Sequence, residues 1–486
     1  TLLHIFLSAT AGSGKTTTIV WLLSFLRDKS VLCCAFNRDI KEELEERCKQ
    51  YSNVKVATLH AIGYGMLKKE YGCGSPDASK YRKIFVNMST RWKLPDDKEF
   101  GSRVMQLVDL FRLCLVKTRS DANEIATLYN ISTEHNEVDI ALQVIEAGRC
   151  VTKTIDFTDM IYLPVYYRLK PSTRYAVVCV DEVQDLNKCQ LEFILGFVAP
   201  GGRTIMVGDR WQSIYNFMGS DARSFDTIKT RPNTMVHPLS VTYRCPKLVV
   251  KYIRQLGIND EIEASPTAQD GVINHSARLT DIKDGDMVIS RENLPLAKLC
   301  MQFLEKGVKA YIRGRDMGES LINLIKKTNK ASMIDVIKFL NEDLSKLEKR
   351  LLKKHRGLTQ DDVRSMPEYQ YMKDKISTLK AITHDCKSVG DAQIKISKIF
   401  DDDKSKQGIM LSTVHKAKGL EARNVYIACD WRMPSQYAKT DIEKEQENNI
   451  RFVAYSRSLW SLNFLPKSEF DPYKKRSDGS NDEDDD

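Results

Sequence analysis

The sequence predicts an α/β protein built on parallel sheets. Apolar runs of strand length alternate with segments of helical periodicity, which is the order of β-α-β units. The strand-like runs form two regions, each interrupted by a long helical stretch, and a glycine-rich turn follows the first run. The runs are 2–7, 31–36, 54–58, 176–180 and 204–207 in the first region, and 286–290, 310–313, 408–411 and 424–428 in the second.

The two helical interruptions predict the domain organisation. Val104, Leu107 and Phe111 have the spacing of one apolar helix face, and similar periodicity interrupts the second region. The expected parts are a first lobe (1–60 and 153–235) with its helical insertion (61–152), a second lobe (236–315 and 406–476) with a reduced helical insertion (316–405), and an acidic disordered tail (477–486).

Composition excludes several classes of protein. The longest apolar stretch, 19–26, is far shorter than the ~18 residues that suggest a membrane span, and no secretory signal is evident. The twelve cysteines lack the Cys-x-x-Cys pairs of metal sites, and Cys33, Cys34 and Cys179 fall in apolar strand-like runs. We therefore expect buried, reduced thiols in an intracellular protein, located in the cytoplasm (the host cytoplasm if viral) or in the nucleus if eukaryotic.

The charge distribution favours a polyanionic partner. The formal net charge is +9, and the tail 477–486 contains six acidic residues and no basic ones, so the chain without those six charges stands at +15. Excess positive charge suits nucleic acid, although a well-solvated surface explains it about equally well. The tail is a candidate segment for docking a partner or for masking the protein's own surface.

A phosphate-binding loop is predicted where the first strand meets the first helix. Its residues are Ala9, Thr10, Ala11, Gly12, Ser13, Gly14, Lys15, Thr16 and Thr17. At such a turn, backbone N–H groups hold polyphosphate, Lys15 can reach the β- and γ-phosphates, and Thr16 can ligate Mg²⁺. Ala9 stands where the usual pattern has its first glycine, so an ordinary Gly/Ser-rich turn stays the alternative.

Two carboxylates follow the apolar run 175–180. Asp181 is placed to hold Mg²⁺ together with Thr16, and Glu182 to orient and deprotonate an attacking water. Such a pair alone is more often a solvated strand end, but the upstream loop makes that explanation weaker. Together the two motifs predict hydrolysis of a nucleoside triphosphate with the help of Mg²⁺.

A third segment, 208–217, follows the run 204–207 and could connect hydrolysis to nucleic acid. Gln212 could touch the γ-phosphate, while Tyr215 and Phe217 offer flat faces on which bases stack, each stack being worth roughly 1–3 kcal/mol. Core packing is the alternative for this aromatic pair.

Two arginines of the second region are candidates for neutralising charge in the transition state. Arg244 and Arg457 lie far from the loop in sequence, and arginine suits this task because its charge is fixed and its donors form a fork. Most arginines are surface residues, so these two gain weight only from the motifs around them.

Taken in order, these segments resemble the motifs of superfamily 1 helicases of the UvrD/Rep/PcrA type. The compact layout is most similar to the F-box helicase and small phage-type branches, although no F-box is present. The matching segments are 11–16, 35–38, 58–60, 156–159, 180–185, 208–217, 243–244, 413–421 and 453–457.

The resemblance implies two RecA-like P-loop NTPase lobes with ATP·Mg²⁺ between them and single-stranded DNA across their tops. By motif position it implies ATP hydrolysis for Lys15, Thr16, Asp181, Glu182, Gln212, Arg244 and Arg457, adenine stacking for Tyr243, a place near the sugar for Glu421, and DNA contact for Phe36, Asn37, His60, Tyr215, Phe217 and His415.

The resemblance further implies a monomeric motor that translocates and unwinds in the 3′→5′ direction, acting on single strands and on junctions of single- and double-stranded DNA. The acidic tail is a possible site for a single-strand-binding, replication or recombination protein. Thr17 stands where many relatives carry an arginine, which loosens the expected selectivity for adenine. A translocase that strips bound proteins and an ATP-gated DNA-binding or loading subunit are the alternatives.

Overall fold

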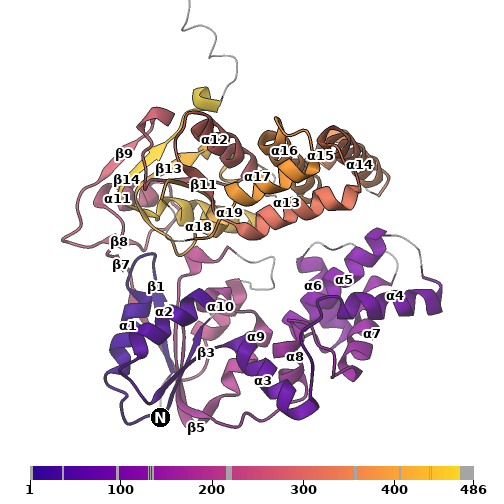
Figure 1. The fold of residues 1–486 in the computed structure, drawn as a ribbon. Helices are drawn as coiled ribbons and strands as arrows, with labels where there is room; N and C mark the ends of the chain where they lie inside the picture. The colour runs from indigo at the N-terminus through magenta and orange to yellow at the C-terminus, as the bar shows by residue number, and fades with distance from the viewer. Residues whose placement is uncertain are drawn as a thin grey trace, which may run out of the picture. The chain divides into compact units, whose positions relative to one another are not determined.

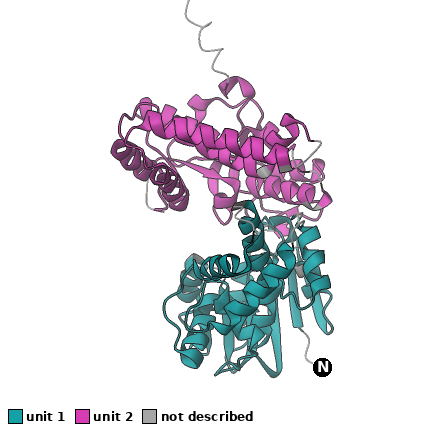
Figure 2. Cartoon of the chain, turned by 90° about the vertical axis from the view of Figure 1, so that its right-hand side faces the viewer, with its two compact units in different colours: residues 1–240 teal, residues 241–486 magenta. Residues whose placement is uncertain are grey.

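Two parallel sheets of six strands each organise the described part of the computed structural model (Figure 1). The structure describes residues 4–35, 38–94, 98–129, 131, 133, 136–214, 222–354, 358–403, 407–436, 438 and 440–470. The chain divides into residues 1–240, called unit 1, and residues 241–486, called unit 2 (Figure 2). The α/β class with parallel sheets that the sequence predicts is confirmed.

Unit 1 contains the first sheet, in the order β3-β2-β4-β5-β1-β6. Its strands are β1 (His4–Ala9), β2 (Val31–Ala35), β3 (Val54–Thr58), β4 (Tyr175–Val180), β5 (Val198–Gly208) and β6 (Thr234–Leu239). Every residue of β2 is buried, and so are five of the six residues of β4. Such continuous apolar runs form because a central parallel strand is covered on both faces.

The edge strand β6 is a difference from the sequence-based expectation. It runs parallel to β1, from the pair His4–Thr234 to the pair Ala9–Leu239. Four of its six residues are exposed, and one of these is Pro238, so its pattern does not look like that of a buried strand. Proline is tolerated at a sheet edge. The expected lobe boundary at 235/236 falls inside this strand.

Helices surround this sheet and form a separate group beside it (Figure 1). Those next to the sheet are α1 (Lys15–Leu23), α2 (Arg38–Cys48), α3 (Leu59–Tyr71), α8 (Asp159–Tyr166), α9 (Lys188–Leu195) and α10 (Ala222–Lys229), with the 3₁₀ turns η1 (Val183–Asp185) and η2 (Arg210–Gln212). The separate group is α4 (Lys80–Trp92), α5 (Lys98–Leu113), α6 (Arg119–Leu128) and α7 (Glu137–Cys150).

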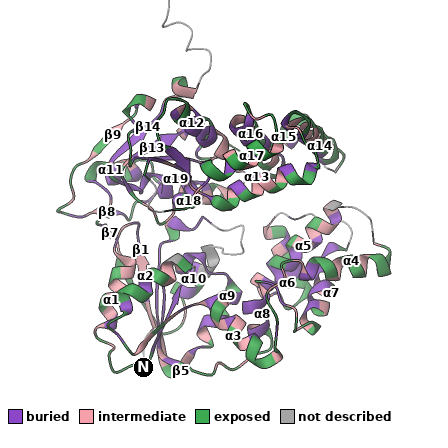
Figure 3. Ribbon diagram, viewed as in Figure 1, coloured by how far each residue is buried: buried purple, intermediate pink, exposed green. Residues whose placement is uncertain are grey.

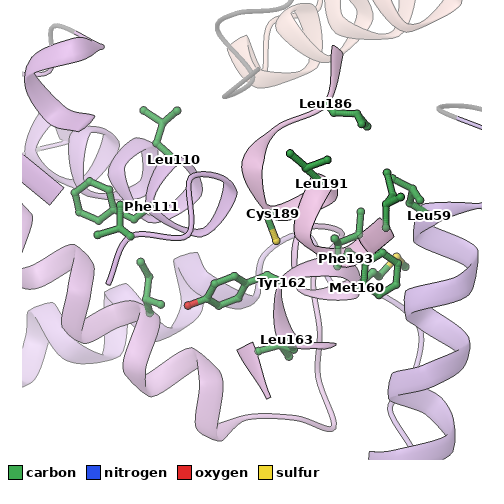
Figure 4. Packing of buried hydrophobic residues seen from close by; sticks show 14 of the residues in the cluster. Leu59, Leu110, Phe111, Met160, Tyr162, Leu163, Leu186, Cys189, Leu191 and Phe193 are labelled. Carbon is green, nitrogen blue, oxygen red and sulfur yellow. The ribbon is translucent and has the colours of Figure 1, made fainter. Parts of the chain in front are cut away.

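One apolar core runs from the sheet into this helical group. It includes Phe6 and Leu32 of the sheet as well as Val104 and Leu107 of α5. Figure 4 shows part of it, including Phe111 of α5, Tyr162 of α8 and Cys189 of α9. The group therefore packs as a continuation of unit 1.

A buried ionic network fastens α4 and α5 to segment 156–159. Arg112 of α5 is fully buried, and its Nη1 donates to Asp156 at 2.9 Å and to Asp159 at 3.2 Å. Lys80 of α4 pairs with Asp159 at 2.6 Å, and the Tyr81 hydroxyl donates to the same carboxylate at 2.8 Å. Removing one member of such a network leaves an uncompensated buried charge, which typically costs ~3–5 kcal/mol.

Unit 2 contains the second sheet, in the order β11-β12-β10-β13-β14-β9. Its strands are β9 (Val272–Asn274), β10 (Met287–Ser290), β11 (Ala310–Ile312), β12 (Ile409–Thr413), β13 (Ala422–Ala428) and β14 (Ser458–Phe464), and β7 (Val241–Thr242) pairs separately with β8 (Glu263–Ala264). Its helices are α11 (Lys247–Gln255), α12 (Asn293–Glu305), α13 (Arg315–Thr328), α14 (Met333–Lys354), α15 (Gln360–Ser365), α16 (Pro367–Thr383), α17 (Val389–Ile399), α18 (Val414–Ala417) and α19 (Asp441–Tyr455).

Strand β14 was missed from sequence because its polar residues are buried. The Asn463 amide donates to the carbonyl oxygen of Val425 at 3.2 Å, and the Ser461 hydroxyl donates to Asn424 at 2.9 Å. These hydrogen bonds let polar side chains occupy the interior, so the segment lacks an apolar strand pattern. Figure 3 shows β13 and β14 mostly buried, while α13 and α14 carry many exposed residues.

All twelve cysteines are free thiols, and nine of them are buried, including Cys33, Cys34 and Cys179. Within the described ranges, no helix is both long and apolar enough to span a bilayer.

Helices α3 and α8 approach so closely that only glycine fits at position 63. A Cβ atom there would lie 1.8 Å from the carbonyl oxygen of Met160, whereas a Cβ at Gly65, on the same helix, would meet no atom within 4 Å. We expect Gly63→Ala to lower the free energy of unfolding by about 1–3 kcal/mol or more because the backbones must separate.

The matched control is Gly65→Ala, which should raise the free energy of unfolding by about 0.5–1 kcal/mol through helix propensity. Chemical denaturation of the two variants checks this pair. Equal stability of both would contradict the close packing of α3 on α8.

Candidate functional site

The predicted phosphate-binding loop lies between β1 and α1. Gly12 has φ of 70° and Gly14 of 79°, a left-handed backbone that glycine adopts without strain. Helix α1 begins at Lys15, so its first N–H groups face the loop. Residues 9–14 therefore have the strand-to-helix geometry that an anion site requires.

Lys15 meets Glu182 within this site. Its Nζ lies 2.8 Å from a Glu182 carboxylate oxygen, and both side chains are largely buried. Burial lowers the pKa of Lys15, but the carboxylates of Glu182, Asp209 and Asp181 outweigh burial, so the pKa is raised overall. The lysine is therefore a fixed positive charge at the carboxyl end of the sheet.

Thr16 and Asp181 form the second contact between the two motifs. The Thr16 hydroxyl donates to the Asp181 carboxylate at 2.7 Å. Burial, and then the Glu182 carboxylate, raises the pKa of Asp181 to about 6. A cation bound beside Asp181 would favour its ionised form.

The residues present fit a magnesium nucleotide. The Ser13 hydroxyl is buried and finds no hydrogen-bond partner among the described residues, so an acceptor from a ligand would satisfy it. Thr16 and Asp181 supply two oxygen ligands, and Mg²⁺ usually completes its shell with phosphate oxygens and water. Within the described ranges no cluster of three or more His, Cys, Asp and Glu could hold a metal by itself.

A chain of hydrogen bonds leads from Glu182 toward segment 208–217. The Gln184 amide donates to the Glu182 carboxylate, and its carbonyl oxygen accepts the Asp209 backbone N–H at 2.9 Å. The Asp209 carboxylate in turn accepts from the Gln212 amide at 2.6 Å. Burial raises the pKa of Asp209 to about 6. Gln212 is thus held within the same network as Glu182.

The residues expected to contact DNA are only partly described. Phe36, Asn37, Tyr215 and Phe217 lie outside the described residues. His60 follows Leu59 at the start of α3, which Thr58 caps by accepting the Ala61 N–H, and burial lowers the pKa of His60. His415 is half-buried in α18, and Thr17 is exposed on α1.

Three separated motifs meet in unit 2. Arg244 pairs with Glu421 at 2.7 Å, and the side chain of Tyr243 beside it is 73% exposed. Arg457 is fully buried and donates to the carbonyl oxygen of Leu420, the residue before Glu421, at 3.3 Å. The cluster thus joins segments 243–244, 413–421 and 453–457.

Gln184 and Asp209 have no role predicted from sequence, although both lie inside the motifs 180–185 and 208–217. Their positions in the sequence do not predict a contact, because they are 25 residues apart and only the fold brings η1 beside the end of β5. The contact between these two buried residues is evident only from the hydrogen bond in the structure.

The buried Arg457 should also stabilise unit 2. Its guanidinium donates to Val453 at 2.8 Å, to Ser456 at 2.9 Å and to Leu420. Arg457→Lys cannot make all three bonds, so we expect it to lower the free energy of unfolding by about 2–3 kcal/mol.

The exposed Arg423 provides the control, because Arg423→Lys should change stability by less than about 0.5 kcal/mol. Denaturant titration of both variants measures the difference. A stable Arg457→Lys variant would show that the guanidinium is not held as described.

Comparisons with known proteins agree with this geometry. Residues 2–233 match the family described as UvrD/REP helicase N-terminal domain. The ATP-dependent DNA helicase Rep of Buchnera aphidicola (subsp. Acyrthosiphon pisum, strain APS) is 20% identical over 94% of this chain and 91% of its own length. Rep of Escherichia coli K12 is 25% identical over 50% of this chain, and PcrA of Staphylococcus aureus Mu50 is 24% identical over 54%.

The alignments with the last two relatives cover 39% of each of those proteins. The family match spans the strands, loop and carboxylates that form the site of unit 1. Two parallel α/β lobes of the RecA-like kind accompany it. The match over residues 2–233 and the names of these relatives support a UvrD-like helicase of superfamily 1.

Proposed function

We propose that this chain is an ATP-dependent DNA helicase and single-stranded DNA translocase working in the 3′→5′ direction. The observation that carries the proposal is the pair of contacts Lys15–Glu182 and Thr16–Asp181, which joins a phosphate-binding loop to two carboxylates. The relatives' names, ATP-dependent DNA helicases Rep and PcrA, support DNA as the track. The direction rests on the motif resemblance.

The contacts suggest how hydrolysis proceeds. When polyphosphate enters the loop, Lys15 exchanges its partner Glu182 for phosphate oxygens. The released Glu182 carboxylate can then orient a water and take its proton. Thr16 and Asp181 would hold Mg²⁺, which would neutralise charge on the phosphates. Gln212 lies in the same network and is proposed to face the γ-phosphate.

The remaining roles are proposed on motif position. Arg244 and Arg457 neutralise charge in the transition state of ATP hydrolysis. Tyr243 stacks on the adenine base, and Glu421 lies near the nucleotide sugar. The described DNA-side residues, His60 and His415, stand at or near the start of helices that follow strands of parallel sheets. Segments 61–152 and 316–405 are proposed as helical insertions of two lobes that share one ATP.

The phosphate loop and the base can be tested separately. We expect Lys15→Ala to abolish DNA-stimulated ATP hydrolysis by removing the charge that binds phosphate. Glu182→Gln should lower kcat by about 10²–10⁴-fold by removing the base. Both should retain single-strand binding, measured by fluorescence anisotropy, because neither residue is proposed to touch DNA.

Lys29→Ala is the control, since Lys29 is exposed and pairs only with its neighbour Asp28 in the described contacts. It should hydrolyse ATP as the unaltered chain does. Normal turnover in Glu182→Gln would remove this residue from the proposed mechanism.

Polarity and unwinding are tested together with tailed duplexes. With ATP and Mg²⁺, the chain should displace a strand from a 3′-tailed duplex and leave a matched 5′-tailed duplex intact. Unwinding of the 5′-tailed substrate alone would reverse the proposed direction. Hydrolysis with displacement of a bound recombinase, but without unwinding, would favour the protein-stripping translocase.

A further inference from the structure

The carboxamide of Gln184 connects segment 180–185, in which it lies, with segment 208–217. We propose that Gln184 is a positioning residue for ATP hydrolysis, which holds the Glu182 carboxylate and ties it to the turn beginning at Asp209. The inference rests on the proposed function and adds a residue to it. Four features of the structure support it.

First, the amide of Gln184 uses both its donor and its acceptor. The side chain is 1% exposed and belongs to η1, two residues after Glu182. Its Nε2 donates to the Glu182 carboxylate, and its Oε1 accepts the Asp209 backbone N–H at 2.9 Å. Leucine, methionine and ionised glutamate all lack a hydrogen-bond donor, so none of them can replace both bonds.

Second, the residues around Gln184 leave room for its side chain, because position 208 is a glycine and the Glu182 backbone is left-handed. A Cβ atom at Gly208 would lie 2.8 Å from Gln184 Oε1 and 2.5 Å from a methyl carbon of Val183. Glu182 has φ of 54°, a left-handed conformation that is uncommon for a residue other than glycine. The end of β5 and the turn after β4 therefore fit together around this amide.

Third, each of the two carboxylate oxygens of Glu182 contacts a different side chain. One carboxylate oxygen meets Lys15 at 2.8 Å, and the other accepts from Gln184. Lys15 is the residue that phosphate would draw away. Gln184 can keep the carboxylate aimed after that exchange, because its own bond does not involve the phosphate.

Fourth, Gln184 contacts the turn with its backbone as well. The Ser213 hydroxyl donates to the Gln184 carbonyl oxygen at 3.4 Å, and Asp209 accepts from the backbone N–H of Trp211 at 3.0 Å and from Gln212. Residues 209–214 lead to Tyr215 and Phe217, the proposed base-stacking residues. A displacement of that turn would be transmitted through Gln184 to the Glu182 carboxylate.

The first test is the neutral variant Gln184→Met, which keeps the side-chain length and loses both hydrogen bonds. We expect kcat for single-strand-stimulated hydrolysis to fall about 10–100-fold, because a small misplacement of a catalytic group has that effect. KM for ATP and the affinity for a fluorescent ATP analogue should stay within about twofold of the unaltered chain.

The matched control is Gln190→Met, which removes a different amide of unit 1, one that is partly buried and caps α9. It should leave kcat unchanged. A kcat for Gln184→Met within twofold of this control, or a loss confined to KM, would overturn the proposal.

The second test does not need catalytic activity and serves if Gln184→Met fails to fold. Gln184→Glu places two carboxylates side by side and should lower the midpoint of thermal unfolding at pH 7.5. Exchanging the pair, Glu182→Gln with Gln184→Glu, restores a carboxamide beside a carboxylate. We expect this double variant to recover most of the lost midpoint while turnover stays low.

The two tests separate failure of the inference from failure of the proposed function. A double variant no more stable than Gln184→Glu alone would overturn the contact between these residues. Absence of ATP hydrolysis by the unaltered chain would instead reject the proposed function, and the thermal comparison would still decide whether Gln184 holds Glu182.

Discussion

The site of unit 1 is organised by a charge that must be balanced away from water. Lys15 stands at the first position of α1, where the loop after β1 leaves it largely buried, and the carboxylates after β4 and β5 surround it. A buried ion pair contributes little net stability because desolvation offsets attraction. The contribution of these charges is to the geometry of the site, because they hold the ends of β1, β4 and β5 close together.

Hydrogen bonds also link the residues that follow these strands. Asp181 and Asp209 both have a raised pKa because they are buried. Asp181 accepts a hydrogen bond from Thr16 of a distant segment, and Asp209 accepts one from Gln212 of its own turn. The Gln184 amide bridges the two strand ends. Ligand binding can change this network. Polyphosphate would replace Glu182 as the partner of Lys15, and a cation would bind beside Asp181.

Sequence patterns predicted most of the fold because buried parallel strands are continuous apolar runs. Strand β3 has the predicted bounds, and β2 and β4 differ from prediction by one residue. The patterns failed at β6, which is an exposed edge, and at β14, whose polar side chains are buried but hydrogen-bonded. The loop, Asp181 and Glu182 followed from motif spacing, whereas Gln184 and the buried setting of Arg457 depend on contacts between distant segments.

The division of the chain has a consequence for how such a protein can be rearranged. Each unit is one uninterrupted stretch of polypeptide, and a single covalent link, between Ser240 and Val241, joins them. Every strand end that surrounds Lys15 is encoded before that link. Recombination or engineering could therefore exchange the second half through one junction while leaving the entire lysine-centred network intact.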